Sequence, residues 1–341
     1  MKALVVRLSS IGDVVHTLPA LAALSEQGWQ VGWLVEAPAR PLLLGQPMLA
    51  DVVEAPAARR FALQPARDAL RALRDGHYDV AIDFQGLWKS AAWTRLSGAQ
   101  RLLGFAAPDR RESLSSLLVR EHALMPPEAV HVIDKNLALL RALDIEAVGQ
   151  RRFPLPPAPA AAESIERFLG ATGFHDFAIL NPGGGWTGKL WPPERYAGVA
   201  RGLQQRGTPV LVTWGPGEEA LADRIVAAAP DSATKCYATS LLEYVELARR
   251  ARLVVAADTG PLHLACAVGT PVVGIFGPTD PARNGPFSSE DLVVRRTPLC
   301  APCHKRRCDV HHGVMEAIAE SEVLSAIDRR LAGAGARPLA V

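Results

Sequence analysis

The sequence predicts an α/β protein built from two doubly wound domains, each a parallel sheet covered by helices. Its 341 residues suggest two domains at about 150 residues each, and a hydrophobic content of 49% suffices for two packed cores. Short apolar runs alternate with amphipathic segments in both halves, which favours parallel sheets joined by right-handed crossovers. A proline-rich stretch at 153–159 cannot sustain a helix and predicts a linker between the halves.

Both halves contain the elements that this fold requires. In the first half we expect strands at 4–8, 29–35 and 78–84, and helices at 66–75, 86–96 and 132–143. In the second half we expect strands at 178–180, 209–213, 253–257 and 271–276, and helices at 194–205, 218–229, 241–249 and 261–268. The predicted organisation is a domain at 1–152, a linker at 153–162, a domain at 163–318 and a C-terminal helical segment at 319–341, with a cleft between the domains.

Charge and hydropathy argue against several classes of partner. A net charge of +2 gives no polyelectrolyte signal, so nucleic acid is not an expected partner. No apolar run reaches the ~18 residues of a spanning helix, so any membrane contact is expected to be peripheral. Arg7 and Asp13 interrupt the first apolar stretch, which argues against a secretory signal. Five cysteines without such a signal fit a reducing cytoplasm.

Asp13 lies in a strand–turn–helix unit at the start of the chain. A tight turn containing Ser10 and Gly12 follows the first strand, and Asp13 then falls in the first helical turn. Ligands bind at such strand ends, and a carboxylate there can accept a proton from a substrate hydroxyl. A helix N-terminus also favours an acidic residue by itself, so this position alone leaves a general base and an ordinary helix charge equally open.

The run 253–271 gives the strongest signal for a binding site. A strand ends at Asp258, Thr259 or Gly260 can cap the next helix, and a proline follows in its first turn. The open N–H groups of such a turn form an anion site that fits the diphosphate of a sugar nucleotide, and His263 can point at it. Cap, proline and histidine coincide at a strand end, which favours the anion site over an ordinary capped helix with a core-facing histidine.

A glycine loop at 183–189 has the spacing of a Walker phosphate-binding loop. The residue after Lys189 is Leu190, so the magnesium-binding hydroxyl of that motif is missing, and the Pro-Pro pair that follows delays the next helix. We therefore reject a kinase or NTPase. What remains is a loop, including Thr187 and Gly188, whose backbone can approach a ligand closely and whose lysine supplies a mobile positive charge for phosphate.

Two further strand ends carry polar residues that either bind a ligand or are ordinary charges at the start of a helix. Glu218 can accept hydrogen bonds from ribose hydroxyls or can simply complement a helix dipole. Gln85 and Lys89 would face the same cleft as Asp13, where Lys89 can meet an acidic acceptor. A solvated lysine at a helix start explains Lys89 equally well.

A cysteine cluster lies near the C-terminus. The segment Cys300-Ala301-Pro302-Cys303-His304 matches the short haem c attachment pattern, but that chemistry needs an exported protein. Cys308, His311 and His312 follow, so a zinc or iron site is conceivable. Because the spacing lacks a clean second pair, we expect no metal and no other cofactor.

Four of these segments together resemble the bacterial lipopolysaccharide heptosyltransferases of glycosyltransferase family nine. They are the runs 9–19, 83–90, 189–192 and 258–263, which span nearly the whole chain in the order of the family. The wording Val-His-Thr-Leu-Pro at 15–19 is most similar to type I members, whereas the segment 300–308 resembles a region of other members.

The resemblance implies a GT-B architecture of two Rossmann-like domains facing a cleft, with the acceptor on the first domain and ADP-heptose on the second. The implied partners are ADP-heptose and a lipid A–Kdo acceptor at the cytoplasmic face of the inner membrane. Asp13 matches the general base of the family. The implied donor-site positions are Thr187, Gly188, Lys189, Glu218, Asp258, Thr259, Gly260 and His263. On the acceptor side we place Ser10, Gly12, Gln85 and Lys89, and a last helix at 321–331 usually crosses back to the first domain.

This chain departs from type I members in its glycine loop. It has Gly184-Gly185-Trp186-Thr187 where they carry a threonine pair before the lysine, so phosphate contacts are expected to shift to backbone N–H groups.

The expected reaction is an inverting transfer of heptose to a Kdo or heptose hydroxyl of the lipopolysaccharide inner core. Asp13 takes the proton of the hydroxyl, whose oxygen attacks the anomeric carbon as ADP leaves. Lys189 and the helix beginning near Gly260 meet the charge on the diphosphate. Four alternatives stay open: a heptosyltransferase acting on a different acceptor, a nucleotide-sugar epimerase, a non-catalytic sugar-nucleotide-binding protein and a dinucleotide-dependent oxidoreductase. The last is disfavoured by the lack of a Gly-x-Gly-x-x-Gly loop.

Overall fold

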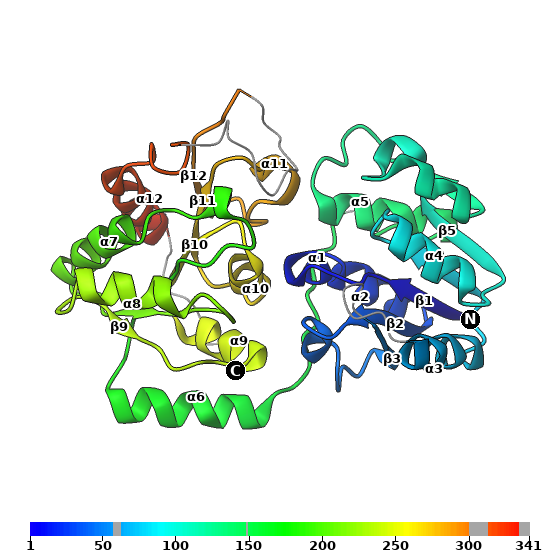
Figure 1. The fold of residues 1–341 in the computed structure, drawn as a ribbon, viewed down its shortest axis with the longest axis horizontal. Helices are drawn as coiled ribbons and strands as arrows, with labels where there is room; N and C mark the ends of the chain where they lie inside the picture. Colours follow the sequence, from blue (N-terminus) through cyan, green and yellow to red (C-terminus); the bar gives the residue numbers. More distant parts are fainter. Residues whose placement is uncertain (57–62, 148, 300–312, 334–341) are drawn as a thin grey trace. The chain divides into compact units, whose positions relative to one another are not determined.

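The chain forms two α/β units, at Met1–Pro157 and Ala158–Val341 (Figure 1). The computed structural model describes residues 1–56, 63–147, 149–299 and 313–333. Each unit contains one six-stranded sheet, and all neighbouring strands are parallel. The predicted class, α/β with two parallel sheets, is confirmed.

The first unit has the strand order β3-β2-β1-β4-β5-β6. Its strands are β1 (Lys2–Val6), β2 (Gln30–Glu36), β3 (Leu49–Ala55), β4 (Val80–Asp83), β5 (Arg101–Phe105) and β6 (Glu121–Ala123). Its α-helices are α1 (Ile11–Val15), α2 (Leu18–Glu26), α3 (Leu63–Asp75), α4 (Trp88–Leu96) and α5 (Val132–Leu139). Its 3₁₀ helices are η1 (Arg40–Leu42), η3 (Ala107–Asp109), η4 (Ser113–Leu118) and η5 (Leu140–Leu143).

The second unit has the order β12-β11-β10-β7-β8-β9. Its strands are β7 (Ala178–Asn181), β8 (Val210–Val212), β9 (Thr234–Lys235), β10 (Leu253–Ala257), β11 (Val272–Phe276) and β12 (Leu292–Arg295). Its helices are α6 (Pro159–Thr172), η6 (Thr187–Lys189), α7 (Pro193–Gln205), α8 (Glu219–Ala228), α9 (Leu241–Arg250), α10 (Gly260–Ala267), α11 (Pro281–Asn284) and α12 (Glu320–Gly333).

Helix α6 starts inside the segment that the sequence assigns to the linker. Residues 159–162 belong to this helix, because Pro159 occupies the first helical position, where its missing N–H costs no hydrogen bond. Ile165 and Leu169 are the buried residues of the helix. The proline-rich stretch therefore ends in a helix instead of continuing as a linker to residue 162.

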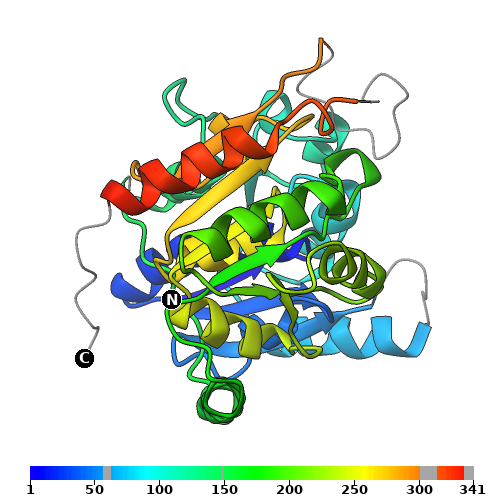
Figure 2. The same cartoon turned by 90° about the vertical axis from the view of Figure 1, so that its left-hand side faces the viewer.

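The last helix packs on the second unit. We expect it to cross back to the first domain, but α12 lies against α7, β11 and β12, and Figure 2 shows it in red alongside α7 in green. The cause is its apolar stripe, since Val323, Ala326 and Ile327 are fully buried in the core of the second unit.

Both sheets have the same topology, which fixes where a ligand can bind. Read from the β9 edge, the second sheet repeats the 3-2-1-4-5-6 order of the first. In such a sheet the connections from the two middle strands run to opposite sides, because the strand order reverses between them. A crevice therefore opens at the carboxyl ends of these two strands. Those strands are β1 and β4 in the first unit, and β7 and β10 in the second. Asp13, Gln85, Lys189 and Asp258 all follow these four strands.

Candidate active site

In the first unit, Asp13 lies in the first turn of α1, as predicted. Ser10 is the N-cap residue, and both its backbone N–H and its hydroxyl donate to Oδ2 of Asp13 at 3.1 Å. Gly12 is buried within the same helix. The Asp13 side chain keeps 37% of its surface exposed, so its carboxylate remains accessible to a substrate.

Arg7 holds the other oxygen of Asp13. Its Nη2 lies 2.6 Å from Oδ1 of Asp13, and the arginine side chain is buried. Arg7 also donates to the carbonyl of Phe84, and its own carbonyl accepts from the Trp33 indole at 3.2 Å. In the sequence alone, Arg7 is only a charge that interrupts an apolar run. Its position at the end of β1, six residues before Asp13, is the signal that would have found it.

Gln85 contacts the segment that leads into this turn, whereas Lys89 pairs with the end of β2. The Gln85 Oε1 accepts from the backbone N–H of Leu8 at 2.8 Å, which ties the strand end of β4 to that of β1. Lys89 forms a close ion pair with Glu36, and burial lowers the pKa of its ammonium. Lys89 is thus a half-buried, paired lysine and not a freely solvated one.

In the second unit, the Asp258 carboxylate is the centre of a buried polar cluster. Lys189 donates to Oδ2 at 2.6 Å, and the His263 Nε2 lies 3.2 Å from Oδ1. The Asp258 side chain is only 3% exposed. Burial acts to raise its pKa, but the hydrogen bond from His263 and the charge of Lys189 outweigh burial and hold the pKa well below its usual range. Asp258 therefore stays ionised.

Lys189 is more constrained than the mobile charge that the sequence suggests. Besides its ion pair with Asp258, it donates to the Asp258 carbonyl at 3.2 Å and lies over the Trp186 ring, 4.6 Å from the centroid. The expectation that the next helix starts after the lysine is confirmed, because α7 begins at Pro193. Thr187 and Gly188 share the single turn η6 with Lys189.

Asn284 is a member of this cluster that sequence reasoning missed. Its Nδ2 donates to Oδ1 of Asp258 at 2.8 Å. It ends α11, whose N-cap Asp280 and Pro281 follow the strand end of β11. That cap–proline pair repeats the pattern of residues 259–261, and it is the signal that would have pointed here.

The N-terminus of α10 lies directly beside the cluster. The Thr259 hydroxyl donates to the Ala257 carbonyl at 3.3 Å and does not cap the helix. Gly260 begins the helix, and Pro261 follows. His263 is buried and directed at the Asp258 carboxylate. The sequence predicts instead that it points at the anion of a ligand.

Glu218 joins the glycine loop to the neighbouring strand end. Its Oε1 accepts from the Gly184 N–H at 2.9 Å, and its Oε2 accepts from the Gly215 N–H at 3.2 Å. A Cβ at position 183 would collide with this carboxylate, so the glycine at 183 leaves room for Glu218 in its present position. Each carboxylate oxygen retains a second lone pair, so Glu218 can still accept a hydrogen bond from a ligand.

The described residues contain neither a group placed to bind a metal nor a helix that could span a membrane. Over 1–56, 63–147, 149–299 and 313–333, no group of three or more His, Cys, Asp or Glu side chains is placed to hold a metal. Cys300, Cys303, Cys308 and their neighbouring histidines lie outside these ranges. Within the same ranges, none of the helices has the length and hydropathy to cross a bilayer.

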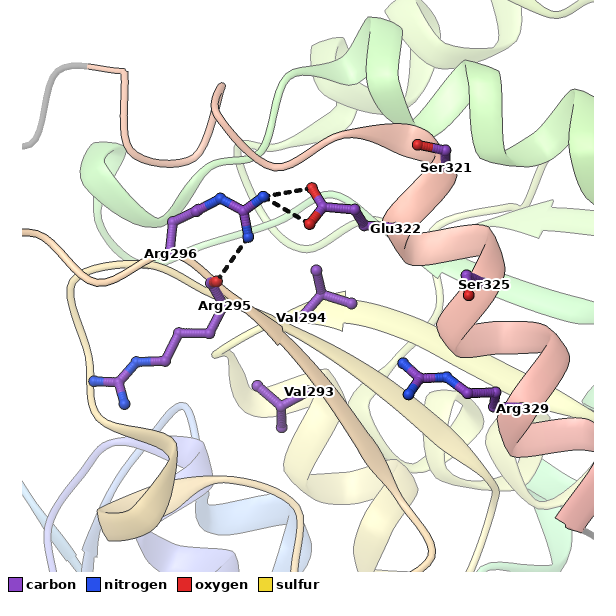
Figure 3. A pocket seen from close by; sticks show the side chains of 8 residues that line it. All are labelled: Val293, Val294, Arg295, Arg296, Ser321, Glu322, Ser325 and Arg329. Atoms are coloured by element: carbon purple, nitrogen blue, oxygen red, sulfur yellow. Dashed lines mark hydrogen bonds and ion pairs between the residues drawn. The ribbon is translucent and has the colours of Figure 1, made fainter.

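A separate hollow of about 430 Å³ lies between β12 and α12 (Figure 3). The Nη2 of Arg296 donates to both carboxylate oxygens of Glu322 across it, at 2.6 and 2.7 Å. None of the residues predicted for the donor site lines it, so we assign it no part in the candidate site.

Comparisons with known proteins identify the family. The family model for glycosyltransferase family 9 (heptosyltransferase) matches residues 67–313. Lipopolysaccharide heptosyltransferase 1 of Pseudomonas aeruginosa is 31% identical over 90% of this chain and 87% of its own. The enzyme of the same name from Escherichia coli K12 is 30% identical over 86% of this chain and 93% of its own.

A solved structure agrees with these relatives. The E. coli heptosyltransferase WaaC with ADP-2-deoxy-2-fluoro heptose superposes with a TM-score of 0.75 at 25% identity, covering 96% of this chain and 99% of that one. The two parallel sheets are accordingly those of a GT-B glycosyltransferase, as the resemblance implied. This chain belongs to glycosyltransferase family 9, the heptosyltransferases.

Proposed function

We propose that this protein transfers heptose from ADP-heptose to a Kdo or heptose hydroxyl of the lipopolysaccharide inner core, with inversion at the anomeric carbon. The observation that carries the proposal is the cluster of Lys189, Asp258 and His263 beside the uncapped N-terminus of α10. It combines a fixed cation with open backbone N–H groups at a sheet switch point, which is the chemistry that a diphosphate requires. The relatives that are named heptosyltransferases support heptose as the sugar that is transferred.

The donor half of the reaction falls to the second unit. The Asp258 carboxylate holds the Lys189 ammonium in place, and that ammonium with the first turn of α10 stabilises the diphosphate as negative charge grows on it. Glu218 accepts from the ribose hydroxyls. Thr187 and Gly188 supply backbone contacts in a loop that lacks the threonine pair of type I members.

The acceptor half falls to the first unit, with Asp13 as general base. The acceptor hydroxyl gives its proton to Asp13, its oxygen forms a bond to the anomeric carbon, and the bond from that carbon to the diphosphate oxygen breaks. Ser10 and Arg7 fix the carboxylate, and Gln85 and Lys89 line the approach of the acceptor. We place the protein in the cytoplasm, peripheral to the inner membrane, because the lipid A–Kdo acceptor is anchored there.

The test is incubation with ADP-heptose and a panel of truncated lipid A–Kdo acceptors, some already carrying heptose, followed by mass spectrometry. We expect one acceptor to gain a single heptose residue as an equal amount of ADP appears. Absence of transfer to every acceptor, or release of free or epimerised sugar without acceptor, would overturn the proposal.

A further inference from the structure

The 3₁₀ helix η4 buries a polar side chain and exposes two apolar ones. A 3₁₀ helix has three residues per turn, so Leu114 and Leu117 lie on one face. These two side chains are 67% and 76% exposed, whereas Ser115 is fully buried. The folded unit therefore turns a serine inward and leaves two leucines in solvent.

A buried polar network enforces this orientation. The side chains of Arg110 and Asp83 are wholly buried and form an ion pair at 2.8 Å. The same Arg110 nitrogen donates to the Ser115 hydroxyl at 3.1 Å, and its Nε donates to the Phe105 carbonyl at 2.6 Å. Because the Arg110 guanidinium donates to Ser115, η4 cannot roll to bury its leucines without losing this buried hydrogen bond.

An exposed tryptophan, two exposed arginines and one exposed glutamate, Glu112, flank η4. Trp88, at the start of α4, is 46% exposed, and its backbone N–H donates to the Glu112 carboxylate at 2.6 Å, which joins α4 to the residue before η4. Arg111 and Arg120 are exposed on either side of η4 in the sequence. Exposed leucines, a tryptophan and flanking arginines are the composition of segments that lie in the interface of an anionic membrane.

We propose that η4 and the start of α4 dock the first unit on an anionic lipid bilayer. Leu114 and Leu117 insert below the headgroups, Trp88 lies at headgroup level, and Arg111 and Arg120 contact the anionic headgroups. The proposal rests on the proposed function, because that function requires an acceptor anchored in a membrane. Two leucines and one tryptophan offer far less area than the roughly 800 Å² per partner of a stable protein interface, and the flanking charge suits a bilayer better than a second copy of this chain.

The test compares Leu114→Ser/Leu117→Ser with a matched control, Leu44→Ser/Leu63→Ser, which changes two exposed leucines elsewhere in the same unit. Each protein is sedimented with vesicles of phosphatidylglycerol and phosphatidylethanolamine, and with vesicles of phosphatidylcholine alone. We expect the wild type and the control to bind the anionic vesicles preferentially, and the η4 variant to lose about tenfold or more in affinity. Thermal melting should not change, because all four leucines are exposed.

Three results would overturn the docking proposal. They are equal vesicle binding by wild type and η4 variant, no binding of the wild type to anionic vesicles, and a wild-type dimer that the η4 variant converts to monomer. The last would show that a second copy covers the leucines.

Activity on two acceptors separates this inference from the proposed function. With an acyl-free, water-soluble Kdo acceptor, the η4 variant should match the wild type, and with the same sugar embedded in vesicles it should be slower. If the wild type binds vesicles through these leucines but transfers no heptose to either acceptor, only the proposed function fails. If the wild type transfers heptose and the η4 variant is as fast as the wild type on each of the two acceptors, only the docking proposal fails.

Discussion

Each unit places a carboxylate after one of the two middle strands of its sheet, and the two carboxylates have different surroundings. Asp13 follows the central strand β1 of the first sheet, and Asp258 follows β10, which neighbours the central strand β7 of the second. The Asp13 side chain is 37% exposed and forms an ion pair with Arg7 at 2.6 Å. The Asp258 side chain is 3% exposed and accepts from Lys189, His263 and Asn284.

This difference separates two kinds of chemistry on one fold. An accessible carboxylate with acceptor capacity to spare can take a proton from a substrate. A buried carboxylate surrounded by donors cannot reach a substrate hydroxyl, but it can fix the position of a cation. The fold supplies the strand end, and the donors that the sequence places around it decide the role.

The largest effect is expected from Asp13→Asn. The amide keeps the shape of the side chain but cannot take a proton, so turnover should fall by about 10²–10⁴ with ADP affinity unchanged. Single-turnover rates and calorimetry with ADP measure the two quantities. Asp134→Asn is the matched control, since Asp134 also lies in the first turn of a helix of the first unit and pairs with an arginine. If Asp13→Asn kept near-normal turnover, Asp13 would be only a helix charge.

Asp258→Ala should act first on stability. It leaves Lys189 and His263 without their common partner in a buried site, which costs about 3 kcal/mol in the free energy of unfolding. Chemical denaturation at neutral pH measures this loss. A loss no larger than that of an exposed ion pair, such as the one broken by Asp328→Ala, would contradict the anchoring role.

Acid should erase this contribution of Asp258. Its pKa in the folded protein is well below the ordinary value of about 3.9, so its ionised form is stabilised by folding. The contribution is complete above about pH 4 and is lost as the pH falls from there toward the folded pKa. The difference in unfolding free energy between wild type and Asp258→Asn should therefore be constant from pH 5 to 7 and shrink below about pH 4, in denaturation series at each pH.

The sequence predicted the strand ends better than it predicted the contacts between them. The places of Asp13, Lys189 and Asp258 after strand ends can be predicted because glycines, prolines and polar residues after an apolar run mark a strand end in local sequence. Arg7 and Asn284 each lie near a strand end, but a strand end does not reveal a partner: the Arg7 pair depends on how the turn before Asp13 folds, and Asn284 reaches Asp258 only by packing of distant segments. The predicted linker at 153–162 extends too far because proline breaks a helix in its interior but can begin one at the first position, as Pro159 does in α6.

Lys189→Ala should have an intermediate effect. One charged hydrogen bond to the diphosphate is lost, which weakens ADP binding by about 1.5–3 kcal/mol and slows turnover as well, since the charge on ADP grows as it leaves. Lys235→Ala is the matched control, because Lys235 also pairs with carboxylates and lies 5.6 Å from the centroid of a tryptophan ring. Calorimetry should show the loss in the first variant alone. Unchanged ADP affinity and rate in Lys189→Ala would mean that this lysine only neutralises Asp258.

The smallest effect is expected from Arg7→Lys, and it tests whether the cation beside Asp13 positions the carboxylate or merely fills the core. Arg7→Gln removes the charge and the ion pair at Oδ1 of Asp13, and should lower kcat about tenfold while the KM for ADP-heptose stays unchanged. Arg7→Lys restores a cation at the end of β1 and should recover most of that loss, although a lysine cannot also hold the Phe84 carbonyl with the same planar fork. Arg101→Gln, which breaks the exposed pair with Glu121 in the same unit, should leave kcat unchanged. If Arg7→Lys were as slow as Arg7→Gln, the guanidinium would act through packing, and the contrast between the two carboxylates would rest on exposure alone.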